Sequence, residues 1–204
     1  MNAVSNGQSG LPTTGFSPDG FSPDVFSTSR FQSAIRSGEF VVTAEVMPPK
    51  GGDPSHMMEM AAHLKDWVHA VNVTDGSRAV LRMSSLACSV LLKQAGIEPI
   101  CQMTGRDRNA IALQSDLMGA HALGVRNVLA LTGDPIKAGD HSKCKPVHEL
   151  ESIRMLRVIR QLNGGTDYTD KEMKDGALRN FPGGAVDPQC KSWSGMQSRF
   201  EKKL

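Results

Sequence analysis

Short apolar runs alternate with longer amphipathic segments along the chain from residue 31 onward. Strict alternation of strands and helices is typical of a parallel sheet with right-handed crossovers, so the predicted fold class is α/β. The apolar runs predict strands over residues 40–46, 70–73, 97–103 and 125–131, with a fifth near 181–186. Apolar residues at helical spacing predict helices over residues 54–67, 83–94, 109–123, 147–162 and 193–203.

Each of the first four predicted strands runs directly into polar residues together with glycine or proline. The clearest case is VLALTGDP at residues 128–135, where a buried strand is followed by a hydroxyl, a glycine and a carboxylate. In a barrel of parallel strands, catalytic groups gather at the carboxyl ends of the strands. We therefore expect one composite site. The other three strand ends are FVVTAEVMPP (40–49), AVNVTDGSR (70–78) and PICQMTGRD (99–107).

Two parallel architectures fit this alternation, an open sheet and a closed barrel. An open dinucleotide-binding sheet carries a GxGxxG turn after its first strand, whereas residues 47–52 read MPPKGG. Polar residues at every strand end favour a (β/α)8 TIM barrel. A complete barrel usually takes about 250 residues, and this chain supplies about five βα units, so we expect a truncated barrel.

Composition excludes several classes of protein. At 204 residues, of which 39% are hydrophobic, the chain is long enough to bury one core. A formal net charge of +2 gives no reason to expect a nucleic acid or an anionic membrane as partner. No segment approaches the roughly 18 apolar residues of a membrane span, and no apolar signal sequence begins the chain. The four cysteines form no CxxC pair, which favours reduced thiols in the cytoplasm: Cys88, Cys101, Cys144 and Cys190.

The first 30 residues differ in composition from the rest. They include GFSPDGFSPDVFSTS, a near-repeat rich in Ser, Pro, Gly and Asp, which buries too little apolar surface to offset its ordering entropy. We therefore expect a disordered, low-complexity tail over residues 1–30 and one folded domain over residues 31–204.

Five motifs follow one another along the predicted domain: TAEVMPPKG, NVTDGSR, QMTGRDRN, LALTGDP and GGAVDP. In this order they resemble methylenetetrahydrofolate reductase, most closely the bacterial branch with RMSSLA and ICQMTGRDRN blocks. The resemblance covers residues 31–204, roughly the first two thirds of the family's catalytic barrel. It implies an FAD-containing (β/α)8 barrel that reduces 5,10-methylenetetrahydrofolate to 5-methyltetrahydrofolate. That reaction belongs to one-carbon metabolism and supplies methionine.

The resemblance gives two carboxylates a part in the chemistry. Glu45, just before Pro48 and Pro49, matches the family's general acid, which protonates a folate nitrogen to open the imidazolidine ring. The residues alone are equally typical of a solvated or salt-bridged Glu at a strand end. Asp134 matches the carboxylate that lies between flavin and pterin, although Asp after Gly133 is also ordinary turn chemistry.

The resemblance also implies cofactor-binding residues around the same rim. Gln102 stands where other branches of the family carry His. Thr132 and Gly133 replace an Arg-Gly pair, so one pyrophosphate contact is missing unless Arg106 or Arg108 supplies the charge; both are also typical solvated arginines. The full set is Thr74, Asp75, Gln102, Thr104, Thr132, Gly133, Asp134, His148, Asp187 and Lys203.

We expect no metal site, because Asp140, His141, Cys144 and His148 match no usual zinc spacing and are more typical of a loop. The resemblance implies a folate substrate and a homo-oligomeric full-length enzyme. It leaves the electron donor open among NADH, NADPH, ferredoxin and an accessory subunit. Since strands six to eight are not in the chain, we expect these residues alone to be inactive. Two alternatives are a non-catalytic flavin- or pterin-binding remnant and a pterin-dependent methyltransferase barrel.

Overall fold

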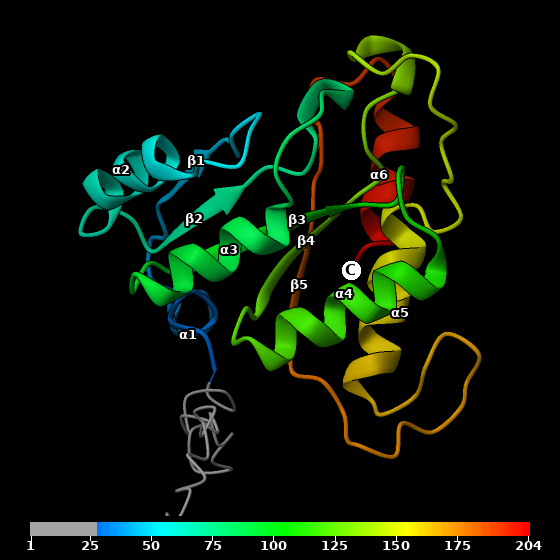
Figure 1. Ribbon diagram of the computed structural model, residues 1–204. Coiled ribbons are helices and arrows are strands. Elements are labelled where there is room, and N and C mark those ends of the chain that lie inside the picture. Colours follow the sequence, from blue (N-terminus) through cyan, green and yellow to red (C-terminus); the bar gives the residue numbers. More distant parts are fainter. Residues whose placement is uncertain (1–27) are drawn as a thin grey trace, which may run out of the picture.

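The computed structural model describes residues 28–204 and shows a five-stranded parallel sheet whose strands follow chain order (Figure 1). This arrangement confirms the α/β class and the partial TIM barrel. Residues 1–27 of the predicted tail lie outside the described residues. The strands are β1 Thr43–Val46, β2 Ala70–Val73, β3 Pro99–Thr104, β4 Asn127–Leu131 and β5 Phe181–Gly184.

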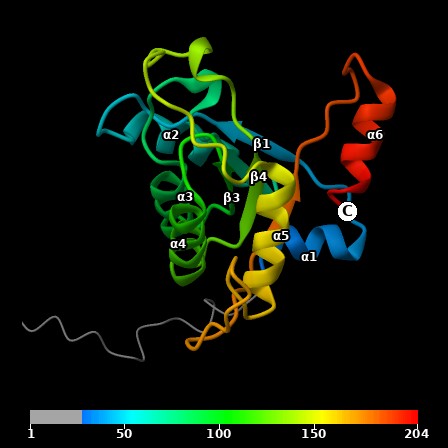
Figure 2. The same cartoon turned by 90° about the vertical axis from the view of Figure 1, so that its right-hand side faces the viewer.

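Helices α2, α3, α4 and α5 cover one face of the sheet, and α1 lies on the other side (Figure 2). Helix α6 lies beyond β5, and the chain end after it contacts α5 through a hydrogen bond from Arg160 Nη2 to the Leu204 carbonyl. No helix among residues 28–204 is long and apolar enough to cross a membrane. The helices are α1 Arg30–Ser37, α2 Ser55–Leu64, α3 Ser85–Gln94, α4 Ala110–Ala122, α5 Ser152–Asn163 and α6 Trp193–Glu201. Two short 3₁₀ turns, η3 Ser77–Ala79 and η4 Ile136–Ala138, lie in the loops after β2 and β4.

Strand residues alternate between the helix-covered face and the opposite, inner face, as the pleat of a β-strand requires. The side chains on the covered face are apolar and pack against α2–α5 in two core clusters. The inner face carries most of the polar strand residues. Covered-face residues include Val46, Val71, Val73, Cys101, Met103, Val128 and Ala130, and inner-face residues include Thr43, Glu45, Asn72, Gln102 and Asn127.

Helix α1 lies at the amino ends of β4 and β5, beside a hollow of about 320 Å³ on the inner face. Ser29 accepts a hydrogen bond from the Gln32 amide (2.9 Å) as the helix cap, and its Oγ donates to Asn127 Oδ1 (2.6 Å). The rings of Phe31 and Phe181 pack edge to face, with centroids 6.2 Å apart. The sequence pattern does not predict α1. The helix has only eight residues with few apolar positions, and it follows directly on the low-complexity segment.

The helix predicted over residues 147–162 begins later than expected, at Ser152. Residues before it pair instead with the loop directly after β3: the Val147 amide donates to the Arg106 carbonyl (2.7 Å), and the His148 amide to the Gly105 carbonyl (3.1 Å). His148 has a φ of +47°, which no helix allows. The amino end of α5 therefore lies at the rim of the sheet.

Gly105 and Gly119 form a matched pair for alanine substitution. A Cβ at Gly105 would overlap the carbonyl oxygen of Leu150, whereas nothing lies within 4 Å of one at Gly119, inside α4. We expect Gly105→Ala to lower the free energy of unfolding by about 1–3 kcal/mol, because backbone must shift. Gly119→Ala should raise it by about 0.5–1 kcal/mol. Urea unfolding measures both changes, and a neutral Gly105→Ala would contradict the close packing of this loop.

Candidate functional site

Glu45 and Gln102 meet on the inner face, near the carboxyl ends of β1 and β3. Gln102 Nε2 donates to Glu45 Oε2 at 3.1 Å. Gln102 is 8% exposed, whereas Glu45 is open to solvent. The bond passes over β2, because Glu45 lies opposite Asn72 in the register and Asn72 lies opposite Ile100. The sheet thus brings together two predicted site residues that are far apart in sequence.

Asp75, just after β2, is held in a buried network. Its Oδ2 accepts hydrogen bonds from the amide (2.8 Å) and hydroxyl (2.9 Å) of Thr104 and from Arg108 Nη1 (2.7 Å). Arg108 also contacts Asp116 of α4 through Nε (2.9 Å). Burial opposes the charge on Arg108, but Asp75 and Asp116 more than offset it and raise the Arg108 pKa. The Asp75 carboxylate therefore joins β2, β3 and α4.

Arg106 is likewise committed to protein contacts and is 3% exposed. Its Nε and Nη2 donate to Asp107, and its Nη1 donates to the carbonyls of Gly76 (3.2 Å) and Asp134 (3.3 Å). The hydrogen bond to Asp107 raises the Arg106 pKa. Arg106 therefore fastens the loops after β2 and β4, and neither it nor Arg108 extends freely into solvent.

Gly133 and Asp134 form the turn after β4. Gly133 has a φ of +93°, and a Cβ there would lie 2.8 Å from Arg106 Cβ, so the turn needs glycine. Asp134 Oδ2 accepts the amide of Arg78 at 2.6 Å, across from the η3 loop. Arg78 and Ala79 have left-handed backbone (φ +58° and +56°). Contacts between the two loops hold this strained segment in place.

A second part of the site is a hollow of about 480 Å³ between the ends of β4 and β5. Predicted residues Thr132, Asp187 and Lys203 line it. Lys203 Nζ donates to the Ala185 carbonyl (2.6 Å), and burial lowers the Lys203 pKa, with the charge of Arg199 acting in the same direction. The wall also includes the first residues of α5 and two residues that sequence patterns did not single out, Arg199 and Phe200.

Two predicted residues differ from the rest in their surroundings. His148 is exposed and does not line the hollow at Lys203; it lies near Asp107, whose pKa its charge helps to lower after the larger effect of Arg106. Thr74, at the end of β2, is buried, and its Oγ1 has no hydrogen-bond partner among the described residues. An orphaned buried hydroxyl at a strand end is available to a bound molecule.

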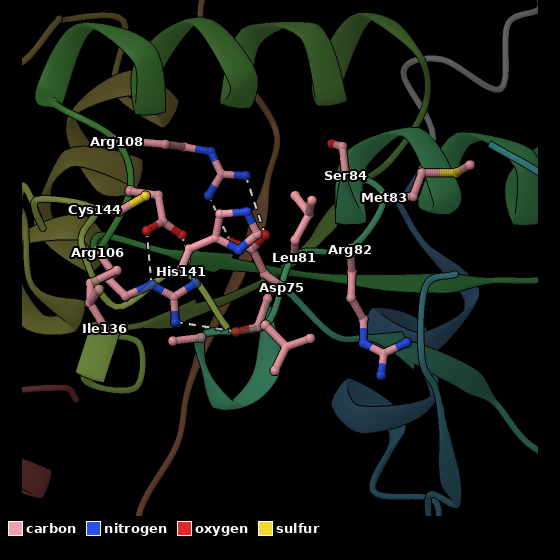
Figure 3. Close-up of a pocket in the computed structure, with 14 residues that line it drawn as sticks. Asp75, Leu81, Arg82, Met83, Ser84, Arg106, Arg108, Ile136, His141 and Cys144 are labelled. Atoms are coloured by element: carbon pink, nitrogen blue, oxygen red, sulfur yellow. Dashed lines mark hydrogen bonds and ion pairs between the residues drawn. The ribbon is translucent and has the colours of Figure 1, made fainter. Parts of the chain in front are cut away.

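A third hollow, of about 370 Å³, lies between the loops after β2, β3 and β4 (Figure 3). Asp75, Arg106 and Arg108 stand along it, joined to their partners by the hydrogen bonds drawn. Asp140 closes the rim nearby, accepting Lys50 Nζ (3.2 Å) and the Leu81 amide (3.0 Å). Within residues 28–204, no three His, Cys, Asp or Glu side chains are grouped to hold a metal ion.

The fold and site together define a β/α-barrel enzyme, since acid, amide, hydroxyl and cationic groups gather where parallel strands end. The family comparison is more specific. The family described as Methylenetetrahydrofolate reductase matches residues 30–204, and the chain belongs to it. Membership makes it an oxidoreductase of folate metabolism with a folate substrate. No match was found among curated proteins.

We expect Asp75 and Arg108 to be coupled in their effects on the free energy of unfolding. Its side chains are only 9% and 18% exposed, so removing one partner leaves a poorly solvated charge. We expect Asp75→Asn to lower the free energy of unfolding by about 2–4 kcal/mol, and to add little once Arg108→Gln is present. A double-mutant cycle in urea measures the coupling. The exposed Lys50–Asp140 pair serves as control and should show little coupling; additive effects at Asp75 and Arg108 would refute the network.

Proposed function

We propose that this chain carries the flavin-dependent reduction of 5,10-methylenetetrahydrofolate to 5-methyltetrahydrofolate, with FAD as cofactor and Glu45 as proton donor to the folate. The observation that carries the proposal is the position of Glu45. Its carboxyl is exposed at a strand end, and one oxygen is held by Gln102. A general acid needs this combination of fixed orientation and access to substrate. Family membership supports folate as the substrate.

The residues present fit FAD. The hollow at Lys203 combines the amino end of α5 with two cations, Lys203 and Arg199, and two carboxylates, Glu151 and Asp187. In this proposal, the helix end and the two cations bind the pyrophosphate. The unpartnered Thr74 hydroxyl suits a contact with the rest of the cofactor. In this proposal, Gly133 binds the cofactor through its backbone. In this proposal, Thr132 and Asp187 bind FAD from the same hollow.

The remaining predicted residues act around the flavin ring and the pterin. Asp134 hydrogen-bonds the pterin and disfavours negative charge on the flavin, as its exposed carboxylate permits. Asp75 contributes mainly by fixing Thr104, because Thr104 and Arg108 engage its carboxylate. His148 is exposed in its loop at the margin of the site. In this proposal, it packs over the adenine of FAD.

In the proposed reaction, Glu45 gives its proton to a folate nitrogen, and the imidazolidine ring opens to an iminium ion. Reduced FAD, when bound, supplies the hydride that reduces this iminium carbon. The sheet contributes orientation, because Glu45 and the cofactor rim extend from strand ends of one rigid frame.

We further infer that the electron donor is NAD(P)H, ferredoxin or an accessory subunit. The enzyme is proposed to be a homo-oligomer, and its product supplies the synthesis of methionine. A cytoplasmic setting agrees with four free cysteines. Burial raises the pKa of Cys88 and Cys101 to about 11, so these two thiols stay protonated.

Glu45→Gln tests the proton donor when it is made in a complete barrel enzyme that contains these residues, since we expect these residues alone to be inactive. We expect FAD to stay bound and donor oxidation to continue, since neither requires this proton. Reduction of methylenetetrahydrofolate should fall by about 100-fold or more. Rapid kinetics of the two half-reactions measure this split. The exposed Glu39→Gln is the control and should change neither rate; a normal folate half-reaction in Glu45→Gln would remove Glu45 from the mechanism.

Lys203→Met tests the cofactor hollow. Loss of one charge near the pyrophosphate should raise the dissociation constant of FAD by about 10-fold to 100-fold. Titration of the protein into FAD, followed by flavin fluorescence, gives this constant. The neighbouring Lys202→Met is the matched control, because Lys202 is exposed and does not line the hollow. Equal affinity in both variants would place FAD elsewhere.

A further inference from the structure

The contact between Gln102 and Glu45 is one-sided. Gln102 Nε2 donates to Oε2 of Glu45, and no described residue bonds Oε1. The carboxyl therefore has one oxygen fixed against the protein and one oxygen open. A carboxylic acid carries its proton on one oxygen only, so the two oxygens have different chemical tasks.

Gln102 itself is rigidly placed. It is buried on β3, and its backbone carbonyl accepts a hydrogen bond from Ser85 Oγ of α3 (2.8 Å). β3 is an interior strand of the sheet, with β2 on one side and β4 on the other. Because its backbone is fixed in this way and its side chain is mostly buried, Gln102 orients the exposed carboxyl of Glu45 better than a mobile surface residue would.

We propose that Gln102 is a positioning residue that decides which oxygen of Glu45 carries the catalytic proton, a proposal that rests on the proton-donor role of Glu45 given above. The carbonyl oxygen of a carboxylic acid is the better acceptor, and an N–H group repels an O–H hydrogen on the same oxygen. The amide of Gln102 therefore makes Oε2 the carbonyl oxygen. The proton resides on Oε1, the open oxygen.

The same contact assists proton transfer. The Oε1–H bond breaks, the proton goes to the folate nitrogen, and the bonding electron pair stays on the Glu45 carboxylate. As negative charge develops, the hydrogen bond from Gln102 becomes charge-assisted and stronger. Stabilisation that grows along the reaction lowers the barrier, so Gln102 acts on the folate half-reaction.

Other charged groups near Glu45 do not duplicate this contact. Glu45 lines a hollow of about 340 Å³ together with His56 of α2 and Arg82 of the loop before α3. Arg82 Nη1 is directed to the Pro48 carbonyl (2.9 Å). Among the described side chains, Gln102 is the one with a hydrogen bond to the Glu45 carboxyl.

Gln102→Met keeps the length of the side chain and removes its amide. In the complete, FAD-loaded enzyme, we expect the folate half-reaction to slow by about tenfold more than donor oxidation does, with the KM for folate unchanged. Gln114→Met is the control and should change neither half-reaction, because the amide of Gln114 bonds only Ala110 of α4 and the backbone amide of Tyr168, both outside the candidate site. Equal slowing of both half-reactions by Gln102→Met would overturn the proposal.

The double variant separates this inference from the proposed function. If Gln102 acts through Glu45, Gln102→Met slows nothing further in a Glu45→Gln background. If Glu45→Gln alone leaves the folate half-reaction unchanged, the proposed function fails. If Glu45→Gln slows it and Gln102→Met does not, only the positioning role of Gln102 fails.

The contact also has a readout that needs neither FAD nor turnover. The side-chain amide of Gln102 gives a pair of ¹⁵N–¹H signals in nuclear magnetic resonance spectra. We expect Glu45→Gln to shift them, because the acceptor loses its charge, whereas Glu39→Gln leaves them in place. Gln102 signals that are unchanged in Glu45→Gln would overturn the proposal.

Discussion

The two-residue repeat of the β-strand is the constraint on which the rest of this structure depends. Val46 packs into the core under α2 and α3, and its neighbour Glu45 faces the opposite side of the sheet. On β3, Cys101 and Met103 are buried against helices, while Gln102 between them points inward. A shift of one residue in either strand would exchange the two sets. Hydrophobic burial therefore fixes the direction of the polar side chains, and the stability of the core and the geometry of the candidate site have one cause.

The two-residue repeat ends with the strands. In the loops, hydrogen bonds and ion pairs of buried charged side chains fix the positions of the residues. Asp75 binds Thr104 and Arg108, and Arg106 joins the loops after β2 and β4 through their carbonyls. Buried ionic groups rarely add net stability, but each strongly penalises any arrangement that leaves a partner unpaired. The network thus favours one loop arrangement over others. It also holds the left-handed residue Arg78 where its amide meets Asp134.

The sequence pattern predicted most of the sheet and helices, because apolar spacing reports burial directly. The sequence pattern gave a wrong prediction where backbone amides form hydrogen bonds with a segment far away in the sequence. Residues 147–151 carry a helical pattern, yet residues 147 and 148 pair with the loop that follows β3. For the site, Glu45 and Gln102 were each predicted by resemblance, but the bond between them joins residues 57 positions apart and crosses a strand. The partners of Asp75 were equally hidden, since nothing local distinguishes a solvated arginine from Arg108.

One residue that the family resemblance expects to bind the cofactor pyrophosphate differs in this chain. Thr132 stands where the family resemblance expects an arginine, and Arg106 and Arg108 are held by carboxylates. In the proposed FAD site, positive charge near the end of β4 comes instead from Arg199 of α6 and from Lys203 just after it, in a hollow that Glu151 and Asp187 also line. The amino end of α5 lies in the same wall because that helix starts at Ser152, later than its sequence pattern indicates. An anionic group needs a positive potential at its position, and the potential depends on distance rather than on which element carries the charge. The proposed pyrophosphate site is thus supported by geometry that no single motif encodes.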